Sequence, residues 1–194
     1  NYFDHAKEGG REKPDYPWFF FRGASSLIAH NDAGVVPKVS SKFDYEAELG
    51  VLIGPAARDV AAADALDYVW GYTVVNDVTA RELQAKDVQY SRAKGFDTFA
   101  PIGPCIAVGL DPSELDVEGW VNGQKRQHSN TRELIFPVPY IIEWLTRFMT
   151  LEAGDVITTG TPSGVGPLVP GDRMMVKVQG VGALSNPCVE APQA

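Results

Sequence analysis

The 194-residue chain lacks the features that mark several large classes of protein. Its two cysteines, Cys105 and Cys188, are far apart and in no CxxC spacing, which excludes a disulfide framework and a zinc ribbon. No run of about 18 apolar residues and no signal-peptide pattern occurs. Lys and Arg number 17 against 25 Asp and Glu, and the net charge of -8 argues against nucleic acid or an anionic membrane as partner. We therefore expect a soluble, cytoplasmic protein.

Signatures of nucleotide binding and of acyl-enzyme chemistry are also missing. The glycine-rich turn at residues 159–166 lacks the GK[ST] ending of a P-loop and the spacing of GxGxxG. There is no GxSxG elbow and no cysteine–histidine signature, so a covalent acyl-enzyme has no support. The backbone amides of this turn, at Gly160, and the Thr161 hydroxyl could still clasp a carboxylate, although a plain structural turn has the same composition.

Short strands separated by turns dominate the remaining pattern. A hydrophobic content of 44% is ordinary for a globular protein, and we predict a single domain over residues 1–194. Strands are predicted at residues 18–21, 43–54, 70–78, 100–108, 155–160 and 173–178, with a hairpin at Asn122-Gly123. Short helices are predicted at residues 60–69, after a Thr79–Glu82 capping box, and at 140–149. Many strands, few helices and no βαβ alternation indicate a mostly β (α+β) fold.

Three carboxylates stand out within this pattern. In FDYEAELGVLIG, residues 43–54, Glu46 and Glu48 share one face of a strand, about 6–7 Å apart, which is close enough to reach one ion. Taken alone, the pattern is more often that of a half-solvated strand with its polar face in water. Asp77 stands at the end of the next predicted strand, just before the capping box, where an Asx-type turn residue would also fit. Together the three form a hard oxygen set that suits Mg²⁺, Mn²⁺ or Ca²⁺.

Further polar residues are candidates for substrate contacts and proton transfer. Arg81 and Gln84 share a face of the helix predicted after the capping box. Lys94 lies among small and aromatic residues and could meet a substrate carboxylate or enolate, or be an ordinary surface lysine. His5 and Glu8 lie three positions apart, so that the carboxylate could orient the imidazole, and an exposed ion pair explains the same spacing.

In this order, these segments resemble the fumarylacetoacetate hydrolase family. The matching stretches span nearly the whole chain: NYFDHAKE, FDYEAELGVLIG, GYTVVNDVTARELQ, AKGFDTFAPIGP, VNGQKRQ, IFPVPYIIEWLTRFMTLEAGDVITTGTPSGVG and PGDRMMVKVQGVGALSNP. The resemblance implies a mixed β-sandwich roll with a few short helices, a homodimer and one bound divalent ion. Because the sequence begins at Asn1, we also expect an N-terminal part of the natural chain to precede it.

The resemblance also assigns roles to individual residues. It implies metal ligands at Glu46, Glu48 and Asp77, and a catalytic dyad of His5 and Glu8 on a mobile segment, residues 1–15, that closes over the site. Residues that meet the carboxylate and oxo groups of an oxo-acid substrate are matched at Arg81, Gln84, Lys94, Gly160 and Thr161. The segment QYSRA before Lys94 lacks the tryptophan that many relatives carry there, which leaves the substrate preference open.

The implied activity is hydrolysis of a C–C bond in a 2,4-dioxo acid of the acylpyruvate or fumarylpyruvate type, through a chelated enolate, with Mg²⁺ (or Mn²⁺ or Ca²⁺) as cofactor. An isomerase or decarboxylase of 2-hydroxymuconate-type diacids is the alternative on the same site, because the scaffold does not fix the chemistry. A non-catalytic, calcium-binding β-domain is the alternative outside the enzymes.

Overall fold

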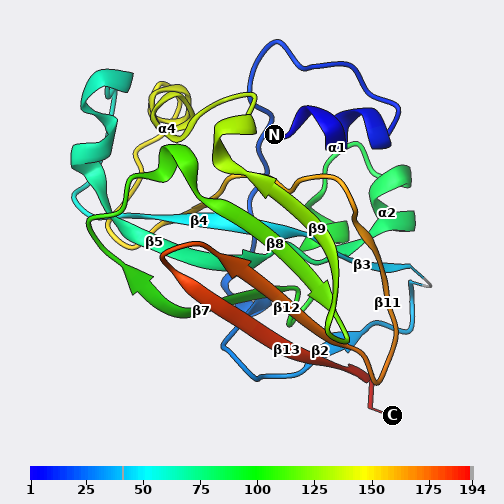
Figure 1. The fold of residues 1–194 in the computed structure, drawn as a ribbon. Helices are drawn as coiled ribbons and strands as arrows, with labels where there is room; N and C mark the ends of the chain where they lie inside the picture. The colour runs from blue at the N-terminus through cyan, green and yellow to red at the C-terminus, as the bar shows by residue number, and fades with distance from the viewer. Residues whose placement is uncertain (41, 193–194) are drawn as a thin grey trace.

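Two five-stranded sheets and a smaller three-stranded sheet make up the fold (Figure 1). The computed structural model describes residues 1–40 and 42–192. The first sheet has the order β1 (Leu27–Ile28), β7 (Ala100–Ala107), β5 (Val69–Asn76), β4 (Ala47–Ile53) and β10 (Val156–Thr158). The second has the order β2 (Gly34–Val36), β13 (Gly182–Glu190), β12 (Arg173–Val178), β8 (Asp116–Val121) and β9 (Gln124–Asn130). The small sheet is β11 (Gly166–Leu168), β3 (Phe43–Tyr45) and β6 (Thr79–Ala80).

The sheets are mixed, and the hydrophobic core lies between them. The pairs β1–β7 and β13–β2 are parallel, and the other pairs are antiparallel. Leu49 and Val74 from one five-stranded sheet and Met174 and Val176 from the other are almost fully buried in one cluster. Because apolar side chains from both sheets meet there, burial of this shared face stabilises the two sheets together. The mostly β prediction is confirmed.

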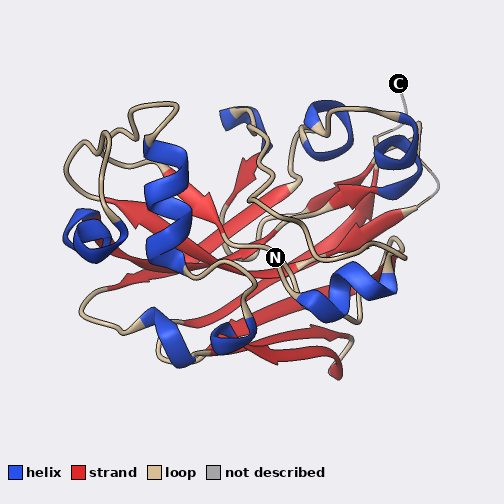
Figure 2. Ribbon diagram, turned by 90° about the horizontal axis from the view of Figure 1, so that it is seen from above, coloured by secondary structure: helices blue, strands red, loops and turns tan. Residues whose placement is uncertain are grey.

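The helices are short and lie outside the sheets (Figure 2). The α-helices are α1 (Phe3–Glu8), α2 (Arg81–Lys86), α3 (Ser91–Lys94) and α4 (Val138–Thr146). The 3-10 helices are η1 (Ala24–Ser26), η2 (Ala62–Tyr68), η3 (Pro112–Glu114) and η4 (Thr131–Glu133). No helix in residues 1–40 and 42–192 is long and apolar enough to cross a membrane.

Several local predictions are confirmed. The Asn122-Gly123 turn joins β8 to β9, and its positive φ angles of 49° and 78° are those of a tight hairpin turn. The strands predicted at residues 70–78 and 100–108 correspond to β5 and β7. The helix predicted at 140–149 is α4, which buries Ile141 and Leu145. Phe148 has helical spacing with Ile141 and Leu145 in the sequence, but it lies beyond the end of α4 and is 57% exposed, so it does not join the buried face.

Three other local predictions are wrong or only partly right. Residues 18–21 form no strand, because no strand in the described part of the chain pairs with them, and Trp18 is 67% exposed. The predicted capping box fails because the Thr79 hydroxyl donates to the Asp77 carbonyl, while Ala80 precedes α2 without a side-chain cap. The helix predicted at 60–69 is the 3-10 helix η2.

Gly50 shows how closely β4 and β5 approach each other. A Cβ atom at Gly50 would lie 2.8 Å from Val75 Cγ2 and 2.9 Å from Thr73 Cγ2. The missing side chain therefore makes room for the neighbouring strand, not for a ligand. We expect Gly50→Ala to lower the free energy of unfolding by about 1–3 kcal/mol, the usual cost of overpacking. Urea unfolding measures it.

The control for this substitution is Gly34→Ala in β2. A Cβ atom there would have its nearest neighbours at 3.8 Å, an ordinary contact distance, so we expect stability within about 0.5 kcal/mol of the wild type. A Gly50→Ala protein as stable as Gly34→Ala would show that the two strands separate without cost.

Candidate active site

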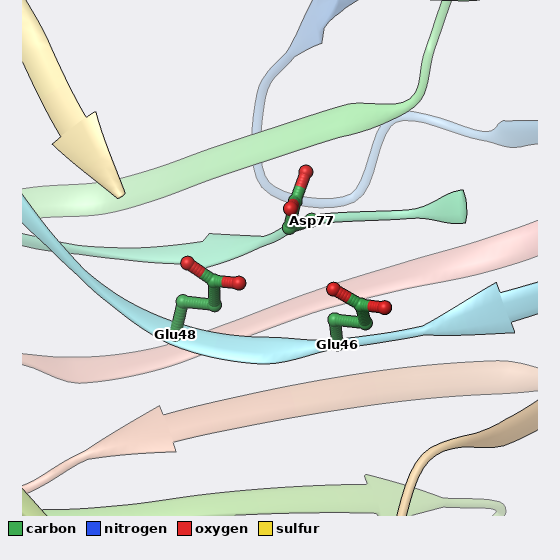
Figure 3. A group of neighbouring side chains, drawn as sticks. All are labelled: Glu46, Glu48 and Asp77. Atoms are coloured by element: carbon green, nitrogen blue, oxygen red, sulfur yellow. The ribbon is translucent and has the colours of Figure 1, made fainter. Parts of the chain in front are cut away.

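The three carboxylates predicted as metal ligands converge in the structure (Figure 3). Glu48 lies in β4, and Glu46 comes directly before it. Asp77 comes directly after β5, which pairs antiparallel with β4. Ala47 lies opposite Asn76, and the Asp77 amide donates to the Glu46 carbonyl at 2.9 Å, so the strand ends are locked in register. One oxygen from each carboxylate lies within 4.8 Å of the others.

All three side chains are buried, which excludes the half-solvated strand. Glu46 is 4% exposed, Glu48 2% and Asp77 3%. The N-terminal segment lies over this face of β4, since Asn1, Tyr2 and His5 line one cavity with the acidic residues. Burial of charge is costly unless other charges compensate it, so the partners of these carboxylates determine what the site can hold.

Cationic side chains already hold two of the three carboxylates. Lys94 Nζ lies 2.8 Å from Glu46 Oε2 and 2.5 Å from Asp77 Oδ2. Arg81 donates to Glu46 Oε1 at 2.5 Å and to Asp44 Oδ2 at 2.9 Å. Burial alone would raise the pKa of Glu46, but the charges of Lys94 and Arg81 lower it to about 2. Glu46 is therefore ionised at every physiological pH.

Glu48 is the carboxylate that remains uncompensated. It accepts a hydrogen bond from the Gly160 amide at 2.7 Å, and within the described part of the chain it forms no ion pair with a lysine or arginine. Burial raises the pKa of Glu48, and repulsion from Glu46 adds to the rise, although Lys94 opposes it. A divalent cation bound among the three would supply the missing charge, and carboxylate oxygens are its preferred ligands. The residues present fit such an ion.

Lys94, Arg81 and Gln84 lie around the same acidic residues. Lys94 is 2% exposed at the end of α3, so it is not a surface lysine. Burial lowers the pKa of Lys94, while Glu46 opposes the shift. Arg81 Nη1 donates to Gln84 Oε1 at 2.6 Å, as expected for two residues on one helical face. All three line the cavity.

His5 and Glu8 form a pair on α1. His5 Nδ1 lies 3.2 Å from Glu8 Oε2, and Glu8 also accepts from the Gly164 amide at 3.1 Å. His5 lines the cavity, whereas Glu8 holds the ring from behind. Burial lowers the pKa of His5, although Glu46 and the hydrogen bond to Glu8 oppose it. The imidazole is therefore neutral near pH 7 and can accept a proton.

The glycine-rich turn supports the carboxylates more than it faces a substrate. The Gly160 amide donates to Glu48, as described above. The Thr161 hydroxyl donates to the Ala47 carbonyl at 3.0 Å and accepts from Gln127 Nε2 at 2.8 Å. Thr161 lines the cavity, but its hydroxyl can donate to a substrate oxygen only if its hydrogen bond to the Ala47 carbonyl breaks.

Two functional residues have no clear signal in the sequence. Arg22 donates to Asp77 and to the Lys94 and Val78 carbonyls, and so joins the aromatic segment to the floor of the site. Gln127 accepts from the Ala47 amide and donates to Thr161 and Pro162, which fixes the turn against β4. A single buried position on a strand that is otherwise largely exposed is the only local sign of Gln127.

These residues surround a cavity of about 960 Å³. Its floor carries the acidic residues together with Lys94, Arg81 and Gln84. Its outer wall is aromatic and includes Tyr16, Trp18, Phe20 and Tyr90. A cavity of this size, with a few charged groups at one end and apolar walls at the other, is typical of a small-molecule site.

Comparisons with known proteins show the family of the chain. A family model for the fumarylacetoacetate (FAA) hydrolase C-terminal domain matches residues 1–189. An uncharacterized protein of Methanocaldococcus jannaschii is 47% identical over 186 residues, which cover 96% of this chain and 78% of that protein.

Two solved structures of named enzymes are also similar. 5-Carboxymethyl-2-hydroxymuconate delta-isomerase from Mycobacterium smegmatis has a TM-score of 0.93 and 44% identity, covering 100% of this chain and 77% of that one. Fumarylpyruvate hydrolase from Pseudomonas aeruginosa, solved with Mn²⁺ and pyruvate, has a TM-score of 0.92 and 35% identity, covering 98% and 87%. The chain therefore belongs to the fumarylacetoacetate hydrolase family.

Proposed function

We propose that this chain is a divalent-metal-dependent hydrolase that cleaves a C–C bond in a 2,4-dioxo acid of the acylpyruvate type. The observation that carries the proposal is that a histidine held by a carboxylate lines the same cavity as three converging carboxylates. The similar fumarylpyruvate hydrolase, solved with Mn²⁺ and pyruvate, supports a divalent ion and a pyruvate-like product.

Glu46, Glu48 and Asp77 would hold the ion, which supplies Lewis-acid polarisation of the substrate's oxygens when it is bound. Lys94 and Arg81, each with several N–H donors at the floor, bind the carboxylate and oxo end of the substrate. Their positive charge stabilises the negative charge that develops on the oxo oxygen as the bond breaks.

His5 acts as the general base. With the Nδ1 proton donated to Glu8, Nε2 is free to accept a proton from the attacking water. The water oxygen bonds to the 4-oxo carbon, the bond between carbons 3 and 4 breaks, and its electron pair forms the enolate of the oxo acid. The proton held by His5 then returns to carbon 3, which yields a carboxylic acid and a 2-oxo acid.

A second candidate is an isomerase acting on a diene diacid. The similar 5-carboxymethyl-2-hydroxymuconate delta-isomerase supports it, since moving a proton between carbons needs the same base and the same stabilised enolate. The two activities differ in their products, because hydrolysis adds water and gives two acids whereas isomerisation leaves the mass unchanged.

Metal removal combined with product analysis tests the proposal. We expect EDTA to reduce turnover of an acylpyruvate to background, and Mg²⁺ or Mn²⁺ to restore it, with two acids found by mass spectrometry. A product of unchanged mass from a hydroxymuconate-type substrate alone would favour the isomerase. Failure to turn over any oxo acid with any metal would overturn both and favour a structural calcium site.

The pH dependence of kcat/KM reports on His5. Because burial lowers the pKa of His5 below its ordinary value near 6.5, the rate should fall only when the medium becomes more acidic than that. The Glu8 hydrogen bond raises this pKa, so Glu8→Gln should move the acid limb to still lower pH and lower the plateau. Exposed Glu114→Gln is the control, and an acid limb that stays in place in Glu8→Gln would contradict the dyad.

A further inference from the structure

We infer that the substrate carries an apolar acyl end, aromatic or branched, and no second carboxylate at that end. This inference rests on the proposed hydrolase function and concerns the part of the cavity that the reaction itself does not use. It follows from the nature of the cavity wall, the place where that wall begins, and the charges available along it.

The aromatic wall begins directly beside the charged floor. Lys94 Nζ lies 5.2 Å from the centre of the Phe20 ring, and Phe20 packs edge-on against Tyr90 with ring centres 5.8 Å apart. A substrate bound at Lys94 therefore lies beside these two rings. Aromatic rings favour apolar and aromatic partners, since their faces and edges pack well against other rings.

The wall continues through Tyr16 and Trp18, which are largely exposed to solvent, although Tyr16 stacks on Trp144. Trp18 is 67% exposed and Tyr16 51% exposed, and both line the cavity. Further apolar side chains in the cavity lining are Phe136, Ile141 and Leu145. Large aromatic side chains exposed at a cavity mouth lose water when a ligand covers them, which favours an apolar ligand.

No surplus positive charge is available for a second carboxylate. Among the described residues that line the cavity, Lys94 and Arg81 are paired with buried carboxylates. The other two cations, Arg11 and Lys13, are exposed and alternate along the chain with Glu12 and Asp15, so that segment has no net charge. A second carboxylate on the aromatic wall would lose its water without gaining a partner.

Paired substrates test the inference. The Mg²⁺-loaded protein is given an aroylpyruvate and an acylpyruvate of similar length that ends in a carboxylate. We expect kcat/KM to be at least about tenfold higher for the aroylpyruvate, within the range that apolar pockets achieve. Phe20→Ala and Trp18→Ala should each reduce this ratio. The control Phe148→Ala, which removes an exposed ring outside the cavity lining, should leave it unchanged.

Calorimetry separates this inference from the proposed function. Phenylpyruvate and a 2-oxo diacid are titrated into the Mn²⁺-loaded protein, where neither needs to react. At least about tenfold tighter binding of phenylpyruvate supports the inference. If no acylpyruvate is turned over, that failure overturns the hydrolase proposal and leaves the inference standing. Equal or stronger preference for the diacid, in rate or in binding, overturns the inference and leaves the hydrolase standing.

Discussion

Replacing His5 with alanine is expected to lower kcat by about 10²–10⁴-fold, the usual contribution of a general base. His5 lies in the cavity wall with Glu8 behind it, and neither a hydrogen bond nor an ion pair joins it to Glu46, Glu48 or Asp77. The affinity for Mn²⁺ should therefore stay within about twofold of the wild type. Stopped-flow turnover and a metal titration on the same preparation measure the two quantities.

The control for His5 is His128→Ala. His128 is half exposed on β9, beside Glu118 and outside the cavity lining, so its loss should leave kcat unchanged. If His5→Ala retained full turnover, the water would need another base, and the dyad would be an ordinary ion pair on a short helix. A matched loss of Mn²⁺ affinity would instead show that His5 shapes the acidic cluster.

The second large effect is expected from Glu48→Gln. Mutation of a residue that hydrogen-bonds to a metal ligand typically lowers metal affinity about 10–100-fold. Removing the charge of a ligand itself should therefore lower the affinity for Mn²⁺ at least about a hundredfold. Glutamine keeps the shape and still accepts the Gly160 hydrogen bond. Titration calorimetry with Mn²⁺ measures the change. Glu118→Gln, remote and paired with Lys125, should bind Mn²⁺ as the wild type does.

The same substitution has an opposite expected effect on the metal-free protein. Because Glu48 is a buried charge without a cationic partner, Glu48→Gln should leave the unfolding free energy equal to or above that of the wild type. Glu46→Gln should instead lower the unfolding free energy by about 1.5–3 kcal/mol, because Lys94 and Arg81 each lose one of their two carboxylate partners and keep only Asp77 and Asp44. Equal destabilisation by both changes would contradict the distribution of charge described here.

The sequence predicts those parts of the site that depend on spacing within one element. Glu46 and Glu48 share a face because they lie two apart along the chain, and His5 meets Glu8 because three positions make nearly one helical turn. Arg81 and Gln84 pair for the same reason. Spacing alone, however, allows two interpretations of the strand at residues 43–54, a metal site or a solvated polar face. It cannot decide between them because the second face is covered by the distant N-terminal segment.

Contacts between distant segments could not be predicted in this way. Arg22 contacts Asp77, 55 positions further along the chain, and no local pattern marks it as part of the site. Residues 18–21 have a strong local preference for strand, but pairing needs a partner, and the rings line a cavity instead. Gly160 and Thr161 are expected to face a substrate, whereas in the structure both donate hydrogen bonds to β4.

Diffraction from crystals soaked in Mn²⁺, with data collected at the manganese absorption edge, tests the metal centre most directly. Lys94 now lies on oxygens of Glu46 and Asp77, so the ion must share or replace that contact. We predict one strong anomalous peak bounded by oxygens of Glu46, Glu48 and Asp77. The absence of a peak there at saturating Mn²⁺, with Lys94 still seated between the two carboxylates, would contradict the metal centre and the chemistry proposed for it.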